Sequence, residues 1–376
     1  MRRIRIFRTG IKMLLLIVNI CFLVMLLISY CAPIYSPDVF FFPAIIGLFY
    51  PILLIINFAF VIFWLIQLKI YFLLSLLAII AGWNIMKKNI GTNKNKYPEE
   101  LQSGFKYLSY NVRLFDQFKW VKGQDYFTRD AIFKFIASES PDVLSFQEFF
   151  HGDENYFPTI GPFIKMQLTD YYHVDYSKVA GKQKHYGLAT FSRFPIVNKG
   201  SIRFANSTSN SGIYTDIVIN SDTIRVFNFH LESIRLSNAD YNYVAEFIDP
   251  SIQSQRNSSS DIILGKFKKA FIKRAEQARI AAEYIQKSPY PVIVSGDFND
   301  TPISYSYHLI SKGLDDAFLK AGRGLGTTYA GKIPFIRIDY ILNSKKLTSS
   351  NFTIHKVSYS DHYPISCIFW LNNKSD

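Results

Sequence analysis

The sequence predicts an α/β protein in which a unit of transmembrane helices precedes a large soluble domain. Three apolar runs without Asp, Glu, Lys or Arg lie between residues 13 and 85. From about residue 103, short β-branched or aromatic runs alternate with segments of helical spacing, which is the pattern of an α/β domain. The chain has 376 residues, enough for more than one structural unit.

The apolar runs predict three membrane-spanning helices within residues 1–86. The first two runs are long enough to cross a bilayer, which takes about 20 residues, and the third is shorter. Pro43 and Pro51 lie inside the second run, and membrane helices tolerate proline better than soluble ones do. The expected helices cover about residues 13–32, 39–66 and 70–85.

Two other interpretations of this region stay open. The first run could be a cleaved signal peptide. Two more apolar runs follow it at once, however, and Tyr30 before Cys31 does not fit a lipoprotein processing site. The whole region could instead be a buried helical domain of a soluble protein, but three nearly uncharged runs argue against that. We therefore expect a multi-pass membrane protein.

The charges beside the apolar runs predict the orientation in the membrane. Residues 1–12 carry five basic side chains, and the first loop, residues 33–38, carries none. Basic residues gather on the cytoplasmic side, so the N-terminus is expected there and the soluble domain on the other side. The lysines after the third run favour the opposite orientation, and they are Lys87, Lys88, Lys94 and Lys96.

Residues 87–102 read as a polar linker, and residues 103–376 as one soluble domain with a two-layered core. The net charge of +13 favours a polyanionic partner such as nucleic acid or anionic lipid headgroups. A positive-inside bias together with a basic surface explains the charge equally well. The three cysteines form neither a disulfide framework nor a zinc pattern.

The soluble domain contains regular elements that can be predicted in order along the chain. Residues 220–222 join two strands as a hairpin, and residues 235–262 form a polar excursion that we expect to be exposed. Helical spacing appears at residues 126–138 and 266–286. The expected strands are residues 105–111, 143–146, 186–192, 213–219, 223–229, 292–294 and 337–342, with a last strand after Pro364.

One stretch, residues 291–300, places polar groups directly after a buried strand. Its β-branched run ends at Gly296, which permits a sharp turn, and Asp297 and Asn299 follow. The C-terminal ends of strands are where α/β sheets usually carry their chemistry. Asp, Asn and Gly also favour turns for local reasons, so this stretch alone leaves a simple turn open.

Other predicted strands end in polar groups too, and the set suits the hydrolysis of phosphate esters. That reaction needs a hard cation, a base for water, and donors that face the developing charge. The sequence lacks a zinc-ligand cluster, a phosphate-binding P-loop and a Gly-x-Ser-x-Gly turn. The polar strand-end residues are Asn111, Glu148, His230, Asp297, Asn299, Asp339, Asp361 and His362.

The motifs around these residues resemble, in order, those of the endonuclease/exonuclease/phosphatase superfamily. The resemblance covers the chain from about residue 105 onward. It implies a two-sheet α/β sandwich with the active site at one edge, and Mg²⁺-dependent hydrolysis of phosphoesters. The motifs are Tyr110-Asn111, Ser145-Phe146-Gln147-Glu148, Phe229-His230-Leu231, Gly296-Asp297-Phe298-Asn299, Arg337-Ile338-Asp339-Tyr340 and Ser360-Asp361-His362.

The resemblance also implies which residues hold the metal. Glu148 would be the principal ligand, Asn111 would help to bind metal or phosphate, and Asp361 would lie beside the metal. Many relatives have an acidic or amide residue two positions after the first Asn, where this chain has Arg113. A second ligand at that place is therefore in doubt, and Arg113 would meet phosphate or form a surface ion pair.

The catalytic roles follow from the same resemblance. Asp297 would orient or deprotonate the attacking water, and Asn299 would position the water or the phosphate. His362 would contact the scissile phosphate, either as base or as donor, with Asp339 holding its ring. His230 would donate to a phosphate oxygen, as in the secreted-nuclease, sphingomyelinase and inositol-phosphatase branches.

We therefore predict a membrane-anchored phosphodiesterase or phosphatase that uses Mg²⁺, with Mn²⁺ as an alternative ion. The predicted substrate is a phosphate ester in nucleic acid or in a phospholipid headgroup. The predicted partner is the lipid bilayer, reached through three helices, and no obligate protein partner is evident. The alternative is a non-catalytic membrane scaffold or sensor that retains the fold.

Overall fold

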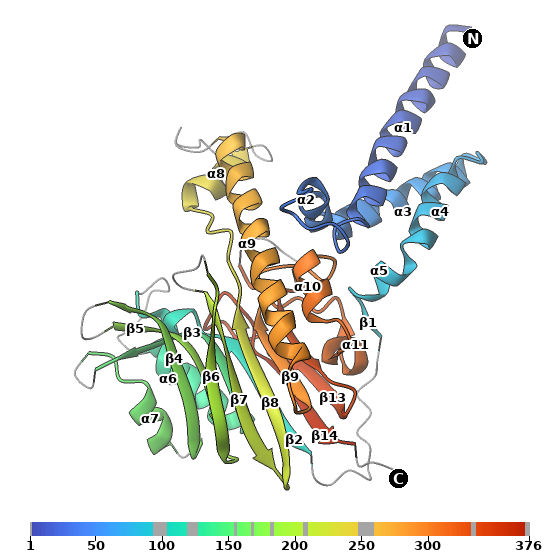
Figure 1. Cartoon of the computed structure of the whole chain (residues 1–376). Coiled ribbons are helices and arrows are strands. Elements are labelled where there is room, and N and C mark those ends of the chain that lie inside the picture. The colour runs from blue at the N-terminus through green and yellow to red at the C-terminus, as the bar shows by residue number, and fades with distance from the viewer. Residues whose placement is uncertain are drawn as a thin grey trace. The chain divides into compact units, whose positions relative to one another are not determined.

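The computed structural model of the chain (Figure 1) divides into two compact units. The first unit comprises Met1–Lys88, Ile234–Ala275 and Ile303–His308, and the second comprises Asn89–Ser233, Glu276–Pro302 and Leu309–Asp376. The residues that the structure describes are 2–92, 104–118, 127–153, 156–166, 169–180, 184–205, 210–246, 259–331 and 336–372.

Two six-stranded sheets form the second unit, and both mix parallel and antiparallel pairs. The predicted two-sheet α/β sandwich is therefore confirmed. One sheet has the order β10 (Asp315–Asp316), β12 (Asp339–Asn343), β9 (Val292–Asp297), β8 (Asp222–His230), β7 (Ser211–Ile219), β6 (Ile196–Arg203). The other has the order β13 (Leu347–Ile354), β14 (Ile365–Leu371), β2 (Phe105–Asn111), β3 (Val143–Gly152), β5 (Lys184–Ser192), β4 (Tyr171–Ala180).

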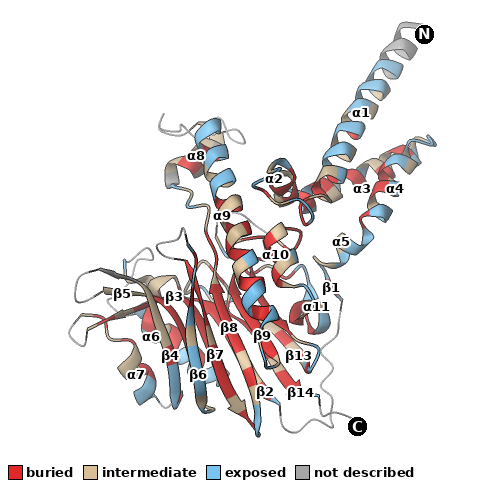
Figure 2. Ribbon diagram, in the orientation of Figure 1, coloured by how far each residue is buried: buried red, intermediate tan, exposed pale blue. Residues whose placement is uncertain are grey.

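The main core of the second unit takes apolar side chains from both sheets. Alternate residues of a strand face the same side, and the central strands are buried along most of their length (Figure 2). One buried cluster joins Tyr107 and Phe369 of one sheet to Val226, Ile293 and Ile341 of the other. This shared cluster holds the two sheets together as a sandwich.

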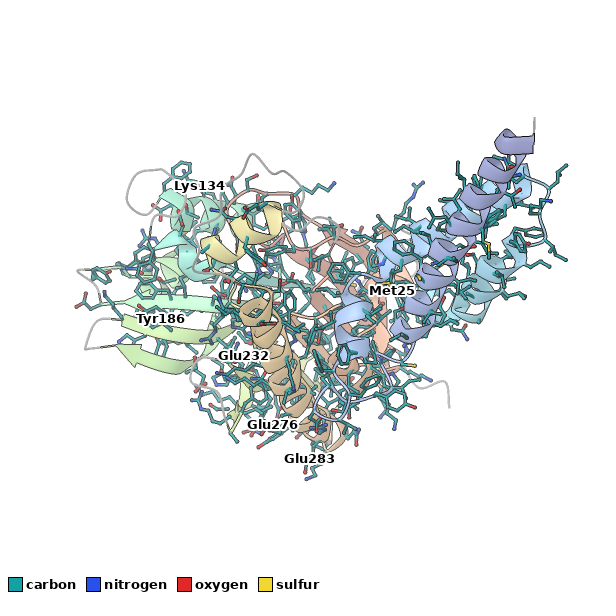
Figure 3. All side chains as sticks on the ribbon, turned by 90° about the horizontal axis from the view of Figure 1, so that it is seen from above. Met25, Lys134, Tyr186, Glu232, Glu276 and Glu283 are labelled. Carbon is teal, nitrogen blue, oxygen red and sulfur yellow. The ribbon has the colours of Figure 1, made fainter. Side chains whose placement is uncertain are left out.

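Helices complete the second unit. A second buried cluster joins α6 (Phe127–Glu139) and α7 (Ile160–Lys165) to strands β2, β3 and β5. The long helix α9 (Ser260–Gln286) belongs to the second unit from Glu276 onward, and this part carries the buried side chains Ala278, Ala281, Ala282 and Ile285, at the spacing of one helix face. Figure 3 shows the side chains from above, with Tyr186 marking β5 and Glu276 and Glu283 marking α9.

Short elements link the strands of the second unit. The predicted hairpin is present, because β7 and β8 are joined by Asn220 and Ser221, both with positive φ, as a two-residue hairpin turn requires. Further short elements of this unit are the 3₁₀ turn Arg113–Asp116, α11 (Ala317–Ala321), and the strand pair β1 (Gly91–Thr92) with β11 (Arg323–Gly324). Helix α10 (Tyr305–Ile310) begins in the first unit and ends in the second.

Parts of two predicted segments lie outside the described residues. The predicted linker, residues 87–102, is described only as far as Thr92, which lies in β1. The predicted excursion, residues 235–262, contains helix α8 (Asn238–Glu246) and the first turn of α9, and residues 247–258 are outside the described part.

The first unit corrects the prediction of three spanning helices. By length and composition, one described helix can cross a membrane, at Thr9–Ser29 within α1 (Arg2–Ser29). The second predicted span is split into α2 (Phe42–Leu48) and α3 (Tyr50–Ile66), bent by 69°, and it counts as a span only if the pair acts as one. The third contains α4 (Phe72–Ala81), which is followed by α5 (Trp83–Lys87).

Proline and helix length explain the correction. Pro51 is the second residue of α3, and its ring has no N–H and opposes continuation of a helix on its N-terminal side. Residues 39–66 therefore form two helices instead of one. Helix α4 has 10 residues, and at 1.5 Å per residue it spans about 15 Å, half of a hydrocarbon core of about 30 Å.

Candidate active site

All eight candidate residues belong to the second unit, and strand register brings them together. Asn111 ends β2 and pairs with Gln147, directly before Glu148. His230 ends β8 and pairs with Asp297, the last residue of the parallel strand β9. The C-terminal ends of neighbouring parallel strands lie at the same edge of a sheet, so each sheet presents its polar groups at one edge.

The two sheets meet at this edge through a direct hydrogen bond. Asn111 donates through Nδ2 to Oδ2 of Asp297 at 3.0 Å. Asp339 begins the antiparallel strand β12 and pairs with Asp297, which adds a second carboxylate to the same edge. Asp361 and His362 lie in the loop before β14, and His362 forms an isolated β-bridge with Tyr329.

Asp297 is the centre of the site and is 1% exposed. Its Oδ1 accepts the backbone N–H of Asn299 at 2.8 Å, and its Oδ2 accepts the side-chain amide of Asn299 at 3.2 Å. Gly296 lets the backbone of β9 lie close to that of β8 directly before Asp297, since a Cβ at this position would lie 1.9 Å from the Phe229 carbonyl oxygen. Asn299 itself has a φ of 52° and also donates to the Leu231 carbonyl at 3.0 Å.

The surroundings of Asp297 raise the pKa of its carboxyl group toward neutral pH. Burial raises the pKa of Asp297 to about 6, with the nearby Asp339 acting in the same direction. His362, His230 and the Asn299 hydrogen bond act in the opposite direction. A carboxylate with a pKa near 6 is ionised at neutral pH and can accept a proton from water.

His362 and Asp339 form a buried pair. Nδ1 of His362 lies 3.0 Å from each carboxylate oxygen of Asp339, and Nε2 lies 3.7 Å from Oδ2 of Asp297. Burial alone would lower the pKa of His362, but Asp339 and Asp297 outweigh it and raise the pKa to about 10. The imidazole is therefore protonated at neutral pH and acts as a donor.

Glu148 lies at an irregularity of β3. It has a φ of 50°, and the pairing of β3 with β5 shifts between Phe146 and Phe149. The Glu148 side chain is 33% exposed. Loss of water around the carboxylate nevertheless raises its pKa, Asp361 adds to the effect, and His362, Asn111 and Arg113 oppose it. Glu148 is thus a partly open carboxylate at the site edge.

Asp361 and Arg113 form an ion pair, with Arg113 Nε 3.6 Å from Asp361 Oδ2 and both side chains about one third exposed. The ion pair predicted as one role of Arg113 is therefore present in the structure. The cation lies where many relatives have a metal ligand, so this position does not provide a second oxygen ligand.

His230 lies between the carboxylates of Glu148 and Asp297. Its Nε2 is 3.7 Å from Oε1 of Glu148 and 3.7 Å from Oδ2 of Asp297. The side chain is 12% exposed. The position next to both acidic groups allows it to donate toward a phosphate oxygen held between them.

Two groups of residues could hold a metal ion. Asp297, Asp339 and His362 have candidate ligand atoms within 4.8 Å of one another and are all buried. In that group His362 already bonds to both oxygens of Asp339. The predicted set of Glu148, Asn111 and Asp361 supplies carboxylate and amide oxygens, the ligands that Mg²⁺ prefers.

The electrostatics favour the predicted set. The carboxylates of Glu148 and Asp361 repel each other enough for Asp361 to raise the pKa of Glu148. A divalent cation between them would remove that repulsion. Glu148 is also partly exposed, which suits Mg²⁺ because this ion keeps several of its waters. The residues present therefore fit the ion.

The structure adds supporting residues that sequence patterns do not indicate. Thr328 is fully buried, and its Oγ1 accepts the backbone N–H groups of Ile338 and Asp339 at 3.0 Å each. Ser360 donates to the Asn111 carbonyl at 2.8 Å and accepts the His362 N–H at 3.2 Å. Ser360 is the first residue of the motif Ser360-Asp361-His362, although its supporting contacts were not predicted, whereas nothing around Thr328 in the sequence marks it.

Comparisons with known proteins agree with this geometry. The model of the Endonuclease/Exonuclease/phosphatase family matches residues 108–362, more than half of the chain. A second model, described as a domain of unknown function (DUF8431), matches residues 12–89. A search of the curated proteins finds no match.

Solved structures share the fold. An endonuclease/exonuclease/phosphatase from Beutenbergia cavernae is 15% identical, with a TM-score of 0.51 and 72% of each chain covered. The human Nocturnin catalytic domain is 18% identical, with a TM-score of 0.52, 72% of this chain and 96% of that one covered. A family protein from Bacteroides thetaiotaomicron is 16% identical, with a TM-score of 0.51, 72% and 99% covered. At such identities the likeness shows the fold alone.

Proposed function

Because the chain belongs to the endonuclease/exonuclease/phosphatase family, we propose that it is a membrane-attached hydrolase that cleaves phosphodiester bonds with the help of Mg²⁺. The family consists of metal-dependent phosphoester hydrolases. The observation that carries the proposal is the closed set of contacts around Asp297, which joins Asn111, Asn299, His230 and His362 within 3.7 Å.

The proposed mechanism uses Asp297 as the base. Its carboxylate is held by the amides of Asn111 and Asn299 and by the backbone N–H of Asn299, so its position is fixed before substrate arrives. Fixed orientation lowers the entropic part of the barrier. Asp297 accepts the proton of the attacking water, and its raised pKa suits that task at neutral pH.

Two histidines face the charge that develops on the phosphoryl oxygens. His362 is held in its protonated form by Asp339 and donates from Nε2. His230 donates from beside Glu148. Glu148, Asn111 and Asp361 would hold a divalent cation, which would supply further positive charge at the phosphate. Donors that are in place before the reaction stabilise the transition state without reorganisation.

The membrane part of the proposal rests on the outer face of α1. Met13, Leu14 and Ile17 are 66%, 61% and 52% exposed. A contiguous exposed apolar surface of this kind marks a membrane or protein contact. Because Thr9–Ser29 is also long enough to cross a bilayer, the surface is best explained by lipid around the helix.

The inner face of α1 is joined to α3 and α4 by polar side chains that are fully buried. Asn19 donates to Ser75 Oγ at 2.7 Å and accepts Trp64 Nε1–H at 2.9 Å. Ser75 in turn donates to Asn57 Oδ1 at 2.9 Å. Removing α1 as a signal peptide would leave these partners unsatisfied in apolar surroundings, which is costly. We infer that α1 stays in the mature chain.

Retention of α1 gives the first testable prediction. A chain tagged at both ends is expected to stay in the membrane fraction after a carbonate wash, as one full-length species that carries both tags. Recovery of a shorter chain without the N-terminal tag would contradict the inference and indicate a signal peptide. The basic N-terminus favours a cytoplasmic location for that end, and protease access to the C-terminal tag in intact cells reports the side.

The substrate class gives the second prediction. The charge of +13 favours a polyanion, and attachment to the membrane favours a phospholipid headgroup. The detergent-solubilised full chain should be assayed with Mg²⁺ on plasmid DNA, sphingomyelin and bis-p-nitrophenyl phosphate in parallel. We expect turnover of the generic diester together with one of the two natural classes, and that class identifies the substrate. No turnover of any of the three by a folded chain would favour the non-catalytic scaffold.

A further inference from the structure

Asn228 lies in the middle of β8 and is completely buried. Its side chain reaches from one sheet to the other. Nδ2 donates to the backbone carbonyls of Phe146 at 2.9 Å and Ala189 at 3.1 Å, and Oδ1 accepts from Gln147 Nε2 at 2.7 Å. All three polar contacts therefore end on β3 or β5, beside Glu148.

The partners of Asn228 lie where β3 departs from regular pairing with β5. Phe146 pairs with Ala189, and the next pair is Phe149 with Gly187, so two residues of β3 face one residue of β5. This is a β-bulge, which bends a strand and re-aims a side chain. The re-aimed side chain is that of Glu148, whose φ of 50° is unfavourable for a residue with a Cβ.

An unfavourable backbone conformation persists only where its surroundings fix it. Here the Asn228 amide bonds a carbonyl on each strand at the bulge. Gln147, the residue before Glu148, is tied to the same Asn228 side chain and also donates to Ser109 Oγ at 3.2 Å. The three strands β2, β3 and β5 are thus joined around the bulge by two buried amides.

We propose that Asn228 is a positioning residue for Glu148, holding the bulge of β3 so that the Glu148 carboxylate stays directed at the metal site. The inference rests on the proposed function, because Glu148 is the proposed metal ligand. Residues that orient a ligand without touching the ion typically affect metal affinity or activity by about 10–100-fold.

The chain offers a matched control in Asn343, the last residue of β12, the strand that Asp339 begins. Asn343 is 1% exposed, and its Nδ2 also donates to two backbone carbonyls, those of Ser344 at 3.1 Å and Leu347 at 2.8 Å. Asn228→Ala and Asn343→Ala therefore each remove a buried amide that donates to two backbone carbonyls, the first on β8 beside the bulge and the second on β12. A purely structural role would make the two variants behave alike.

The test measures the Kd for Mg²⁺ by calorimetry and the metal-free unfolding temperature, with the full chain in detergent. Both alanine variants are expected to unfold at lower temperature. Only Asn228→Ala is expected to weaken Mg²⁺ binding, by about 10–100-fold, with Asn343→Ala remaining within about twofold of the wild type.

A second variant, Gln147→Met, keeps the two Asn228 bonds to carbonyls and removes the bonds that Gln147 donates to Asn228 Oδ1 and to Ser109 Oγ. It is expected to weaken Mg²⁺ binding less than Asn228→Ala does. An unchanged Kd in folded Asn228→Ala overturns the inference, and if that variant does not fold, an unchanged Kd in Gln147→Met does the same. If the wild-type chain binds no Mg²⁺, the proposed function itself fails, which is a distinct result.

Discussion

Replacement of Asp297 with Asn is expected to lower kcat for phosphodiester hydrolysis by about 10²–10⁴-fold, the usual contribution of a general base. Asp297 is the carboxylate whose pKa burial raises to about 6. It is also the one that accepts hydrogen bonds from both Asn111 and Asn299. An amide of the same shape fills the space but cannot accept a proton from water.

The matched control is Asp216→Asn. Asp216 is also 1% exposed and lies in the same sheet, on β7, where it pairs with Arg225 at 2.7 Å. This substitution breaks a buried ion pair, which destabilises the fold, and should leave turnover per folded molecule unchanged. Measurement of kcat together with thermal unfolding separates the two effects. Equal losses of kcat in the two variants would remove Asp297 from the chemistry.

Replacement of Asp339 with Asn is expected to lower the rate at pH 8 by about 10²–10³-fold, as for the loss of one transition-state donor. In the wild type, Asp339 and Asp297 raise the pKa of His362 to about 10, so the ring is protonated across the neutral range. Without the Asp339 charge, the pKa of His362 falls, so a smaller fraction of the rings is protonated at pH 8 than in the wild type. The loss should be smaller at pH 6, where more of the ring stays protonated.

The same pair predicts how stability depends on pH. The pKa of His362 is raised from 6.5 to about 10 in the folded chain. Its stabilising contribution is therefore fully present below about pH 6.5 and is lost as the pH rises through about 10. The wild-type unfolding temperature should fall more steeply between pH 7 and pH 10 than that of Asp339→Asn. The role of the pair would be refuted by an equal loss of rate at pH 6 and pH 8 together with parallel stability curves.

The apolar patterns and polar ends of the buried strands predicted most of the central strands, and the resemblance of the motifs to a known family implied their arrangement as a sandwich. The stretch around Asp297 shows this best, with a β-branched run that is followed by a glycine and two polar residues. Edge strands were missed, since Tyr171–Ala180 and Ile196–Arg203 carry exposed and polar side chains that weaken the alternation. An edge strand has a neighbour on one side only, so its pattern is less constrained.

The details of the site depend on long-range contacts that no local pattern contains. The strand predicted at residues 143–146 continues to Gly152, because a bulge at Gln147 and Glu148 interrupts its regularity without ending it. Asn228, which bonds to that bulge, looks in the sequence like an ordinary interior position of a strand. In the first unit, length and apolar composition identified the helical region, but Pro51 and the short α4 determined where the helices end.

We propose that the residues around Glu148 and Asp297 form a Mg²⁺-dependent hydrolytic site. The most direct test is turnover of bis-p-nitrophenyl phosphate by the full chain in detergent, after EDTA treatment and again after Mg²⁺ is restored. We expect no turnover with EDTA, recovery with Mg²⁺, and no recovery in Asp297→Asn. Turnover by the wild type that persists after EDTA treatment would contradict this proposal. Turnover by Asp297→Asn that recovers with Mg²⁺ to the wild-type level would contradict it as well.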